Sequence, residues 1–375
     1  MLRTKVLIIG GGPAGATAAK FLAGSGVDTV LVERDLSYKK PCGGGIPSSA
    51  FDELDIPRDA VTNEISTVRI VSPRGETVDV ELKGGWICIA ERGVLDRSLR
   101  DQAGQKGAHI IEGAFDRFET VGTPIVSLVR RRQDGRELAI ASDYVIASDG
   151  ITSRVAAAAG ALKQDFLYTI SARVVPSQGK VCEFWFGEEH AANFYSWVFP
   201  SRGYASVGTG SSTPRGLTTL LDAFVRRRYS DSLQSLAGKG VLEKTRAFRI
   251  PVWKGTPFSI NNILFAGDAA GAVMPVTYEG IYYAMKSGEF AARALIERNP
   301  AAYGKLWNSR FRARFLFMNR VRKHLFKSNA TIEKWVALHK NADIQELAVK
   351  LWLHKRKDKN PLVSYMNVFK HLIAG

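Results

Sequence analysis

The segment at residues 5–35 constrains the fold of this chain more than any other. It reads KVLIIGGGPAGATAAKFLAGSGVDTVLVERD. The apolar, β-branched run at residues 6–9 predicts a buried strand, and residues 29–32 predict a second one. Between them, the Ala-rich pattern at residues 14–22 predicts a helix. The segment therefore predicts a βαβ unit at the start of the chain.

Three glycines follow the first strand at the spacing GxGxxG. In a dinucleotide site, Gly10 permits the tight turn, Gly12 lets the backbone approach a pyrophosphate, and Gly15 lets the helix pack on the strand. The helix N-terminus offers N–H groups and the positive end of its dipole to that pyrophosphate. Glu33 ends the second strand, where a carboxylate accepts hydrogen bonds from a ribose hydroxyl. The pattern predicts a dinucleotide site; the alternative is a glycine-rich turn in an ordinary βαβ unit.

Length and composition indicate an ordinary folded protein. A chain of 375 residues accommodates two or three domains. The three cysteines, Cys42, Cys88 and Cys182, form no disulfide framework and no metal-ligand spacing, so we expect a reducing, cytoplasmic compartment and no metal. The chain enters a core strand at once and has no apolar run of about 18 residues, so neither a signal peptide nor a transmembrane helix is expected.

The formal net charge of +16 is unusual, and such proteins often meet nucleic acid or anionic membranes. No nucleic-acid motif is present, so nucleic acid is not an expected partner. Residues 305–327 carry no acid but many cations, at Lys305, Arg310, Arg312, Arg314, Arg320, Arg322, Lys323 and Lys327. At helical spacing they alternate with an aromatic face at Trp307, Phe311, Phe315 and Met318. A basic amphipathic helix of this kind is typical of peripheral binding to a membrane surface; the alternative is that the aromatic face docks on the protein.

The loop at residues 38–47 holds three consecutive glycines, Gly43 to Gly45, bounded by prolines, so it is neither helix nor central strand. Cys42 precedes the glycines, which suggests a functional loop rather than a flexible surface turn. Arg92 lies in the first turn of the helix predicted at residues 91–103, where a cation opposes the helix dipole. It indicates either an anionic partner or a solvated arginine.

Alternating patterns predict strands at residues 64–90, 108–147, 166–210 and 241–252. The aromatic clusters at residues 184–186 and 195–200 indicate a large apolar pocket or a sheet core. Residues 301–375 look mostly helical. Two further apolar strands end in short motifs, the first in Asp149 and Gly150 and the second in Gly267 and Asp268.

With the glycine motif, these strand ends resemble the FAD-binding flavoproteins that include the aromatic hydroxylases. The resemblance implies that the first motif holds the ADP half of FAD. It also implies that Asp268 accepts hydrogen bonds from ribityl hydroxyls, and that the following helix N-terminus faces the flavin. The cofactor-binding residues expected on this basis are Gly10, Gly12, Pro13, Ala14, Gly15, Glu33, Arg34, Cys42, Gly43, Gly44, Gly45, Arg92, Asp149, Gly150, Gly267, Asp268, Gly280 and Ile281.

Within that group, residues 40–47, 197–200 and 267–288 resemble geranylgeranyl reductases. The resemblance implies that reduced FAD delivers hydride to isolated C=C bonds of a prenyl chain on a pigment, lipid or quinone. Tyr278 stands where many members have glycine, and Phe194-Tyr195-Ser196 departs from a common Gly-Tyr-Ala. We place Tyr195, Trp197 and Tyr278 at the substrate pocket and leave the substrate open.

Cys42 corresponds to a family cysteine near the flavin, so it is the candidate catalytic residue; donating a proton, tuning the flavin and packing all stay open. The electron donor is NADPH bound transiently, reduced ferredoxin or a reduced quinone, and the basic surface suits an acidic ferredoxin. The rival functions are a flavin monooxygenase or halogenase of the same fold and a non-catalytic flavin-binding membrane protein.

The predicted fold class is α/β (α+β). A Rossmann-like FAD-binding domain takes residues 1–62, 91–160 and 255–298. An inserted antiparallel-sheet domain for substrate takes residues 63–90 and 161–254. A helical C-terminal region takes residues 299–375.

Overall fold

The computed structural model describes residues 1–161, 163–175, 180–229, 243, 246–255 and 258–353. The chain divides into two compact units, each discontinuous in sequence. The first comprises Met1–Lys39, Gly93–Asp165 and Pro251–Arg312, and the second comprises Lys40–Arg92, Phe166–Ile250 and Ala313–Gly375. Parts of the predicted strand at 241–252 and of the predicted helical region at 301–375 lie outside the described residues.

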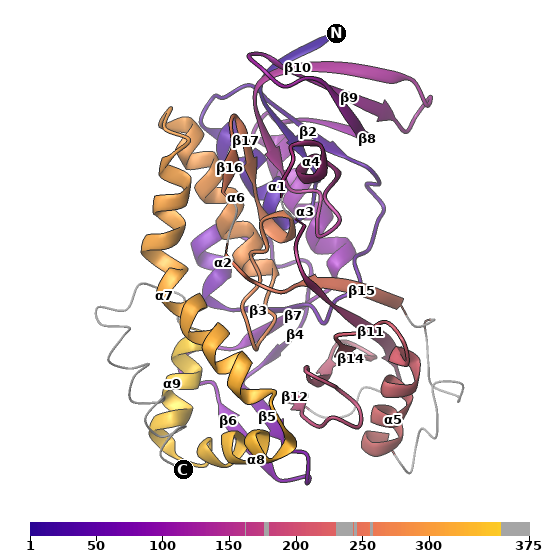
Figure 1. Ribbon diagram of the computed structural model, residues 1–375, viewed down its shortest axis with the longest axis vertical. Helices are drawn as coiled ribbons and strands as arrows, with labels where there is room; N and C mark the ends of the chain where they lie inside the picture. Colours follow the sequence, from indigo (N-terminus) through magenta and orange to yellow (C-terminus); the bar gives the residue numbers. More distant parts are fainter. Residues whose placement is uncertain (162, 176–179, 230–242, 244–245, 256–257, 354–375) are drawn as a thin grey trace. The chain divides into compact units, whose positions relative to one another are not determined.

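A parallel sheet forms the centre of the first unit (Figure 1). Its strand order is β8-β2-β1-β10-β17, which is typical of doubly wound dinucleotide-binding sheets. β9 pairs antiparallel with residues 113–120 of β8 and with residues 137–142 of β10. β16 pairs antiparallel with β17. The strands are β1 (Leu2–Ile9), β2 (Thr29–Glu33), β8 (His109–Thr120), β9 (Ile125–Arg131), β10 (Glu137–Ala147), β16 (Ser259–Ile260) and β17 (Ile263–Phe265).

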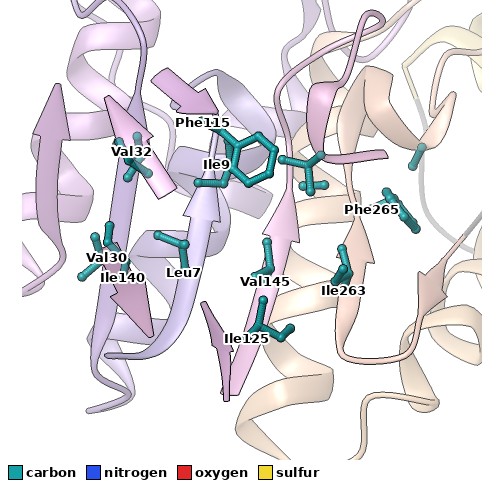
Figure 2. Packing of buried hydrophobic residues seen from close by; sticks show 14 residues of the cluster. Leu7, Ile9, Val30, Val32, Phe115, Ile125, Ile140, Val145, Ile263 and Phe265 are labelled. Atoms are coloured by element: carbon teal, nitrogen blue, oxygen red, sulfur yellow. The ribbon is translucent and has the colours of Figure 1, made fainter. Parts of the chain in front are cut away.

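Both faces of β1 and β2 are buried, as their continuous apolar runs predict. Figure 2 shows Leu7 and Ile9 on the face that packs against Phe115 of β8 and Ile125 of β9. Ile8 is fully buried on the opposite face, where α1 packs on β1. The β8–β9–β10 meander thus covers one face of the sheet and α1 the other.

Helices of the first unit follow the strand ends. They are α1 (Pro13–Gly24), α3 (Arg92–Gln105), α4 (Arg154–Ala158), the 3₁₀ turn η1 (Gly267–Ala270) and α6 (Ile281–Ile296). α6 packs on α1 at Gly288, where a Cβ would lie 2.1 Å from the Ala14 carbonyl oxygen. This contact keeps α6, and the motif that precedes it, against the glycine motif.

The second unit is built on a seven-stranded sheet of order β15-β11-β14-β13-β12-β5-β6, in which β12 pairs parallel with β5. A small antiparallel sheet, β3-β7-β4, accompanies it. The strands are β3 (Gly45–Pro47), β4 (Val61–Ile65), β5 (Thr67–Val71), β6 (Thr77–Glu81), β7 (Ile87–Ala90), β11 (Phe166–Val174), β12 (Cys182–Trp185), β13 (Ser196–Pro200), β14 (Ala205–Ser211) and β15 (Arg246–Pro251). Because β3 pairs with β7, residues 40–62 lie in this unit; the functional names given to the domains stay predictions.

The two faces of the large sheet differ. α5 (Leu217–Tyr229) covers one face through Leu221 and Phe224, which pack on Val198 and Val207. The opposite face is aromatic, with Phe184 and Phe199 in edge contact at 5.3 Å between ring centroids. The remaining helices of this unit are α2 (Ser49–Leu54), α8 (Asn329–Leu338) and α9 (Ala342–Trp352).

α7 (Ala302–Leu325) carries the predicted basic amphipathic pattern. Trp307, Phe311 and Phe315 are each at most 1% exposed, and the Phe311 ring packs on Tyr283 of α6 at 5.2 Å. The aromatic face therefore docks on the protein, and the helix turns part of its basic side to solvent. Among the described residues, no helix combines the length and apolarity needed to cross a bilayer.

Candidate cofactor-binding site

Three strand ends bring the predicted motifs to one edge of the sheet. Ile9 pairs in register with Val32 on one side and with Ala147 on the other, and Ala147 pairs with Phe265. The residues that follow these positions therefore emerge side by side. The strand order reverses between β1 and β10, and open α/β sheets bind ligands at such a switch point.

The glycines of the first motif meet different surroundings. Gly10 has φ +103°, and a Cβ there would lie 2.3 Å from the Ser148 carbonyl oxygen. A Cβ on Gly15 would lie 1.9 Å from the Gly10 carbonyl oxygen, so both positions need glycine for the protein's own packing. A Cβ on Gly12 would meet no atom within 4 Å. This open position fits the approach of a pyrophosphate, although a cofactor contact at Gly12, Pro13 or Ala14 stays a prediction.

Glu33 contacts the glycine loop itself. Its Oε2 accepts the Gly11 N–H at 2.6 Å, and its Oε1 accepts the Asp35 N–H at 3.1 Å. A carboxylate has further lone pairs, so these bonds leave acceptors for a ribose hydroxyl. The neighbouring Arg34 is exposed. Their contacts with the cofactor stay predictions.

Two polar residues that contact the loop were not predicted from the sequence. Arg100 of α3 is buried and reaches the Gly11 carbonyl oxygen; its only signal was its position next to Leu99 on the apolar face of the helix. Ser148 lies within hydrogen-bond distance of the carbonyl oxygens of Ile9 and Gly10, at 2.9 and 2.8 Å. It ties the end of β10 to the loop, and a lone serine before Asp-Gly carries no sequence signal.

Asp149 caps a helix. Its carboxylate accepts the Ser153 hydroxyl at 2.5 Å and the backbone N–H groups of Arg154 and Val155 at 2.8 and 3.2 Å. Burial raises the pKa of Asp149. The carboxylate therefore orders the start of α4, and its predicted contact with the cofactor, like that of Gly150, remains to be tested.

The Gly-Asp motif lies at the start of η1 beside the N-terminus of α6. The Gly267 N–H donates to the Ser287 hydroxyl of α6 at 2.8 Å, a bond that the sequence reading missed. A Cβ on Gly280 would lie 3.9 Å from Asp268 Oδ1. Asp268, Gly280 and Ile281 are therefore close neighbours, as the resemblance implies, and their contact with FAD stays a prediction.

The turn that joins η1 to α6 is strained at two side-chain-bearing residues. Val276 has φ +74° and Tyr278 has φ +50°, in the left-handed region that glycine adopts without cost. The turn closes through the Tyr278 N–H, which donates to the Met274 carbonyl oxygen at 3.0 Å. A left-handed residue other than glycine costs about 1–3 kcal/mol. This conformation explains why glycine suits position 278; the role of the tyrosine in the substrate pocket is untested.

The glycine-rich loop before β3 belongs to the second unit and is packed there. A Cβ on Gly43 would lie 2.4 Å from the Phe199 ring, and one on Gly44 would lie 2.3 Å from the Ala90 carbonyl oxygen. Gly45 continues into β3. The Cys42 thiol is exposed and accepts the Gly44 N–H at 3.3 Å. The loop thus has a defined conformation that presents the thiol to solvent.

The other predicted residues of the second unit are buried. Tyr195 and Trp197 are each 7% exposed, and Tyr195 stacks on Phe194 at 4.7 Å. The Trp197 ring lies over Gly208, where a Cβ would approach it to 2.1 Å. Arg92 is 6% exposed, so it is not a solvated arginine. These contacts make Tyr195 and Trp197 part of the aromatic face of the sheet.

Comparison with known proteins identifies the family. Residues 3–299 match the model of the FAD binding domain family. The chloroplastic geranylgeranyl diphosphate reductase of Oryza sativa subsp. japonica is 30% identical over 386 residues, which cover 94% of this chain and 82% of the relative. The chain belongs to the geranylgeranyl reductase family. The chain is also similar to the digeranylgeranylglycerophospholipid reductase of Methanosarcina acetivorans, at 30% identity over 78% of this chain and 75% of that protein.

The fold is also that of a solved structure of a geranylgeranyl reductase-like protein. The geranylgeranyl bacteriochlorophyll reductase-like protein of Thermoplasma acidophilum superimposes with a TM-score of 0.84 at 23% identity, over 99% of this chain and 96% of that one. The predicted family, fold class and FAD cofactor are therefore confirmed, and the chain is an oxidoreductase of the geranylgeranyl reductase family.

Proposed function

We propose that this protein is a flavin-dependent reductase that saturates isolated C=C bonds of a geranylgeranyl or other polyprenyl chain. One observation carries the proposal: the similarity to a geranylgeranyl diphosphate reductase extends over 94% of the chain, and so over both units. It includes the Cys42 loop and the aromatic sheet as well as the nucleotide motifs.

The chemistry assigns distinct tasks to the protein and the cofactor. Bound FAD, once reduced, supplies a hydride equivalent. An isolated alkene has no carbonyl to polarise, so the protein must bind and orient the chain, exclude water and let a proton reach the second carbon. Phe184, Tyr195 and Trp197 offer an apolar aromatic surface for a hydrocarbon. Cys42 is the proposed catalytic residue because its exposed thiol is available to substrate or flavin.

The assay uses FAD-loaded protein reduced chemically in the absence of oxygen. We expect geranylgeranyl diphosphate, or a geranylgeranyl lipid, to gain one or more pairs of hydrogen atoms by mass spectrometry. Cys42→Ala is expected to retain FAD and lose turnover. A product that gains oxygen or halogen when oxygen is admitted, with no saturated product, would make the protein a monooxygenase or halogenase.

The electron donor is proposed from the sequence. The chain carries one dinucleotide fingerprint, so NADPH would bind only transiently, and reduced ferredoxin is the alternative. An acidic ferredoxin would meet a protein of net charge +16 favourably at low salt. Replacing the chemical reductant by each donor in the same assay distinguishes them.

We also propose that an anionic membrane surface is a partner through the solvent-facing side of α7. This stripe comprises Lys305, Arg312, Arg320, Lys323 and Lys327, which are all exposed. Within the described part of the chain, no acidic side chain forms an ion pair with any of them, whereas Arg69, Arg117 and Arg154 each pair with an acid. Because the aromatic face is buried, the contact would be electrostatic rather than an insertion.

Vesicle co-sedimentation tests this partner. We expect binding to vesicles that contain anionic lipid, and weaker binding at high salt. A variant with Arg312, Arg320 and Lys323 changed to Glu should lose affinity at least about a hundredfold, because each cation near such a surface contributes about 1 kcal/mol. The control changes the exposed Arg97, Lys106 and Arg130 to Glu, which alters the net charge equally. Equal losses in both variants would show that α7 is not the contact.

A further inference from the structure

The first peptide bonds of the glycine loop are held by two buried or half-buried charges from distant parts of the sequence. Glu33 accepts the N–H of Gly11 at 2.6 Å, and Arg100 Nη1 donates to the Gly11 carbonyl oxygen at 3.2 Å. Arg100 Nη2 also donates to the Leu36 carbonyl oxygen at 2.7 Å. Arg100 is 5% exposed, so these bonds form away from solvent.

The side chains leave no room at Gly11. A Cβ there would lie 2.9 Å from the Glu33 Cβ and 3.0 Å from the Arg100 Cδ. The backbone of Gly11 is therefore packed between methylene groups of Glu33 and Arg100, in addition to its hydrogen bonds with both side chains. This double contact defines the orientation of the loop more strictly than either bond alone.

The contacts of Glu33 and Arg100 with Gly11 determine which backbone N–H groups of the loop face a ligand. The Gly10 N–H donates to the Val32 carbonyl oxygen at 2.8 Å, and Glu33 takes the Gly11 N–H. In a trans peptide the carbonyl and the following N–H point in opposite directions. Holding the Gly11 carbonyl toward Arg100 therefore turns the Gly12 N–H away from Arg100. The Gly12 position is open, and helix geometry leaves the first N–H groups of α1 without helical acceptors.

The charge of Arg100 acts in the same direction. The Arg100 guanidinium is positively charged and lies against the Gly11 carbonyl oxygen. It adds to the positive end of the α1 dipole and favours an anionic group on the open side of the loop.

We propose that Arg100 is a positioning residue of the cofactor site. Together with Glu33 it sets the orientation of the Gly11–Gly12 peptide and so preorganises the N–H donors for the FAD pyrophosphate. The inference rests on FAD binding alone and holds whichever substrate the enzyme reduces.

The test measures FAD binding to apoprotein by quenching of flavin fluorescence, together with urea unfolding of the apoprotein. Arg100→Met removes both hydrogen bonds and the charge, and should raise the FAD Kd by about ten- to a hundredfold, the range expected for hydrogen bonds to a charged group. Arg97→Met is the matched control, because Arg97 is exposed on the same helix, and should change Kd less than about threefold.

Arg100→Lys separates position from charge. A lysine keeps the charge, but a single ammonium lacks the planar fork that reaches two carbonyl oxygens. We expect its FAD Kd to lie nearer that of Arg100→Met than that of the unchanged protein. Full recovery with lysine would overturn the positioning role in favour of charge alone. If Arg100→Met folds and its FAD Kd equals that of the control, Arg100 is a structural residue only.

Discussion

Replacing Gly15 with alanine is expected to unfold or severely destabilise the protein and to abolish its flavin absorbance. The new Cβ would lie 1.9 Å from the Gly10 carbonyl oxygen and 2.5 Å from the Ser148 hydroxyl. The Gly10 oxygen belongs to the backbone, so the clash is relieved only if α1 moves away from β1. Overpacking of this kind costs about 3 kcal/mol or more. Urea unfolding and the flavin spectrum of the purified variant measure both effects.

Gly12→Ala is the matched control for that experiment. Gly12 has φ −73° and ψ −174°, which any L-residue adopts, and its Cβ would meet no protein atom within 4 Å. We expect the apoprotein of this variant to keep its stability within about 0.5 kcal/mol, while FAD affinity falls because the methyl group occupies the open side of the loop. Equal stability of the two apoproteins would contradict the packing described for Gly15.

Acid is expected to destabilise the second unit well before ordinary carboxylates titrate. Burial, with the charge of Arg227 nearby, lowers the pKa of His190 to about 3, and burial lowers that of His339 to about 4. The ordinary histidine pKa is 6.5, so the unfolded chain binds more protons than the folded one between these values. The stability that both neutral imidazoles contribute is thus complete above pH 6.5 and is lost as the pH falls toward 3 to 4.

Each histidine lowers the free energy of unfolding by about 1.4 kcal/mol per pH unit. For the pair, the loss between pH 6.5 and 4.5 is on the order of 5 kcal/mol. Urea unfolding across this range measures it. The double variant His190→Gln and His339→Gln should flatten the pH dependence, because an amide keeps hydrogen bonding without titrating. His109→Gln is the control, because His109 is exposed. A double variant that stays as acid-sensitive as the unchanged protein would refute the assignment.

The strained turn at Tyr278 shows which features follow from the local sequence and which need the tertiary structure. The family resemblance implies that a tyrosine stands where many members have glycine. Only the structure shows that its backbone has φ +50°, so that the substitution stores strain. A dihedral angle in a long connection depends on the elements at both ends, here η1 and α6, and no short-range pattern encodes it.

The same division applies to α7. Helical periodicity predicted that Trp307, Phe311 and Phe315 share one face, and they do. Periodicity does not say what covers that face, because an apolar stripe is satisfied equally by a bilayer and by a neighbouring helix. Contact with Tyr283 of α6 settles this part of the question, since it is made between segments that are adjacent only in the folded chain.

The βαβ unit, the glycine motif, the three strand ends and the family could all be predicted from the sequence, because each is a pattern over neighbouring residues whose physical requirement is local. The rest of the site depends on contacts between distant segments. Arg100, Ser148 and Ser287 act on the backbone of segments at least 20 residues away. The role of a buried polar group follows from its hydrogen-bond partner. The partners here come together only when the strands align and α1, α3 and α6 pack around the strand ends.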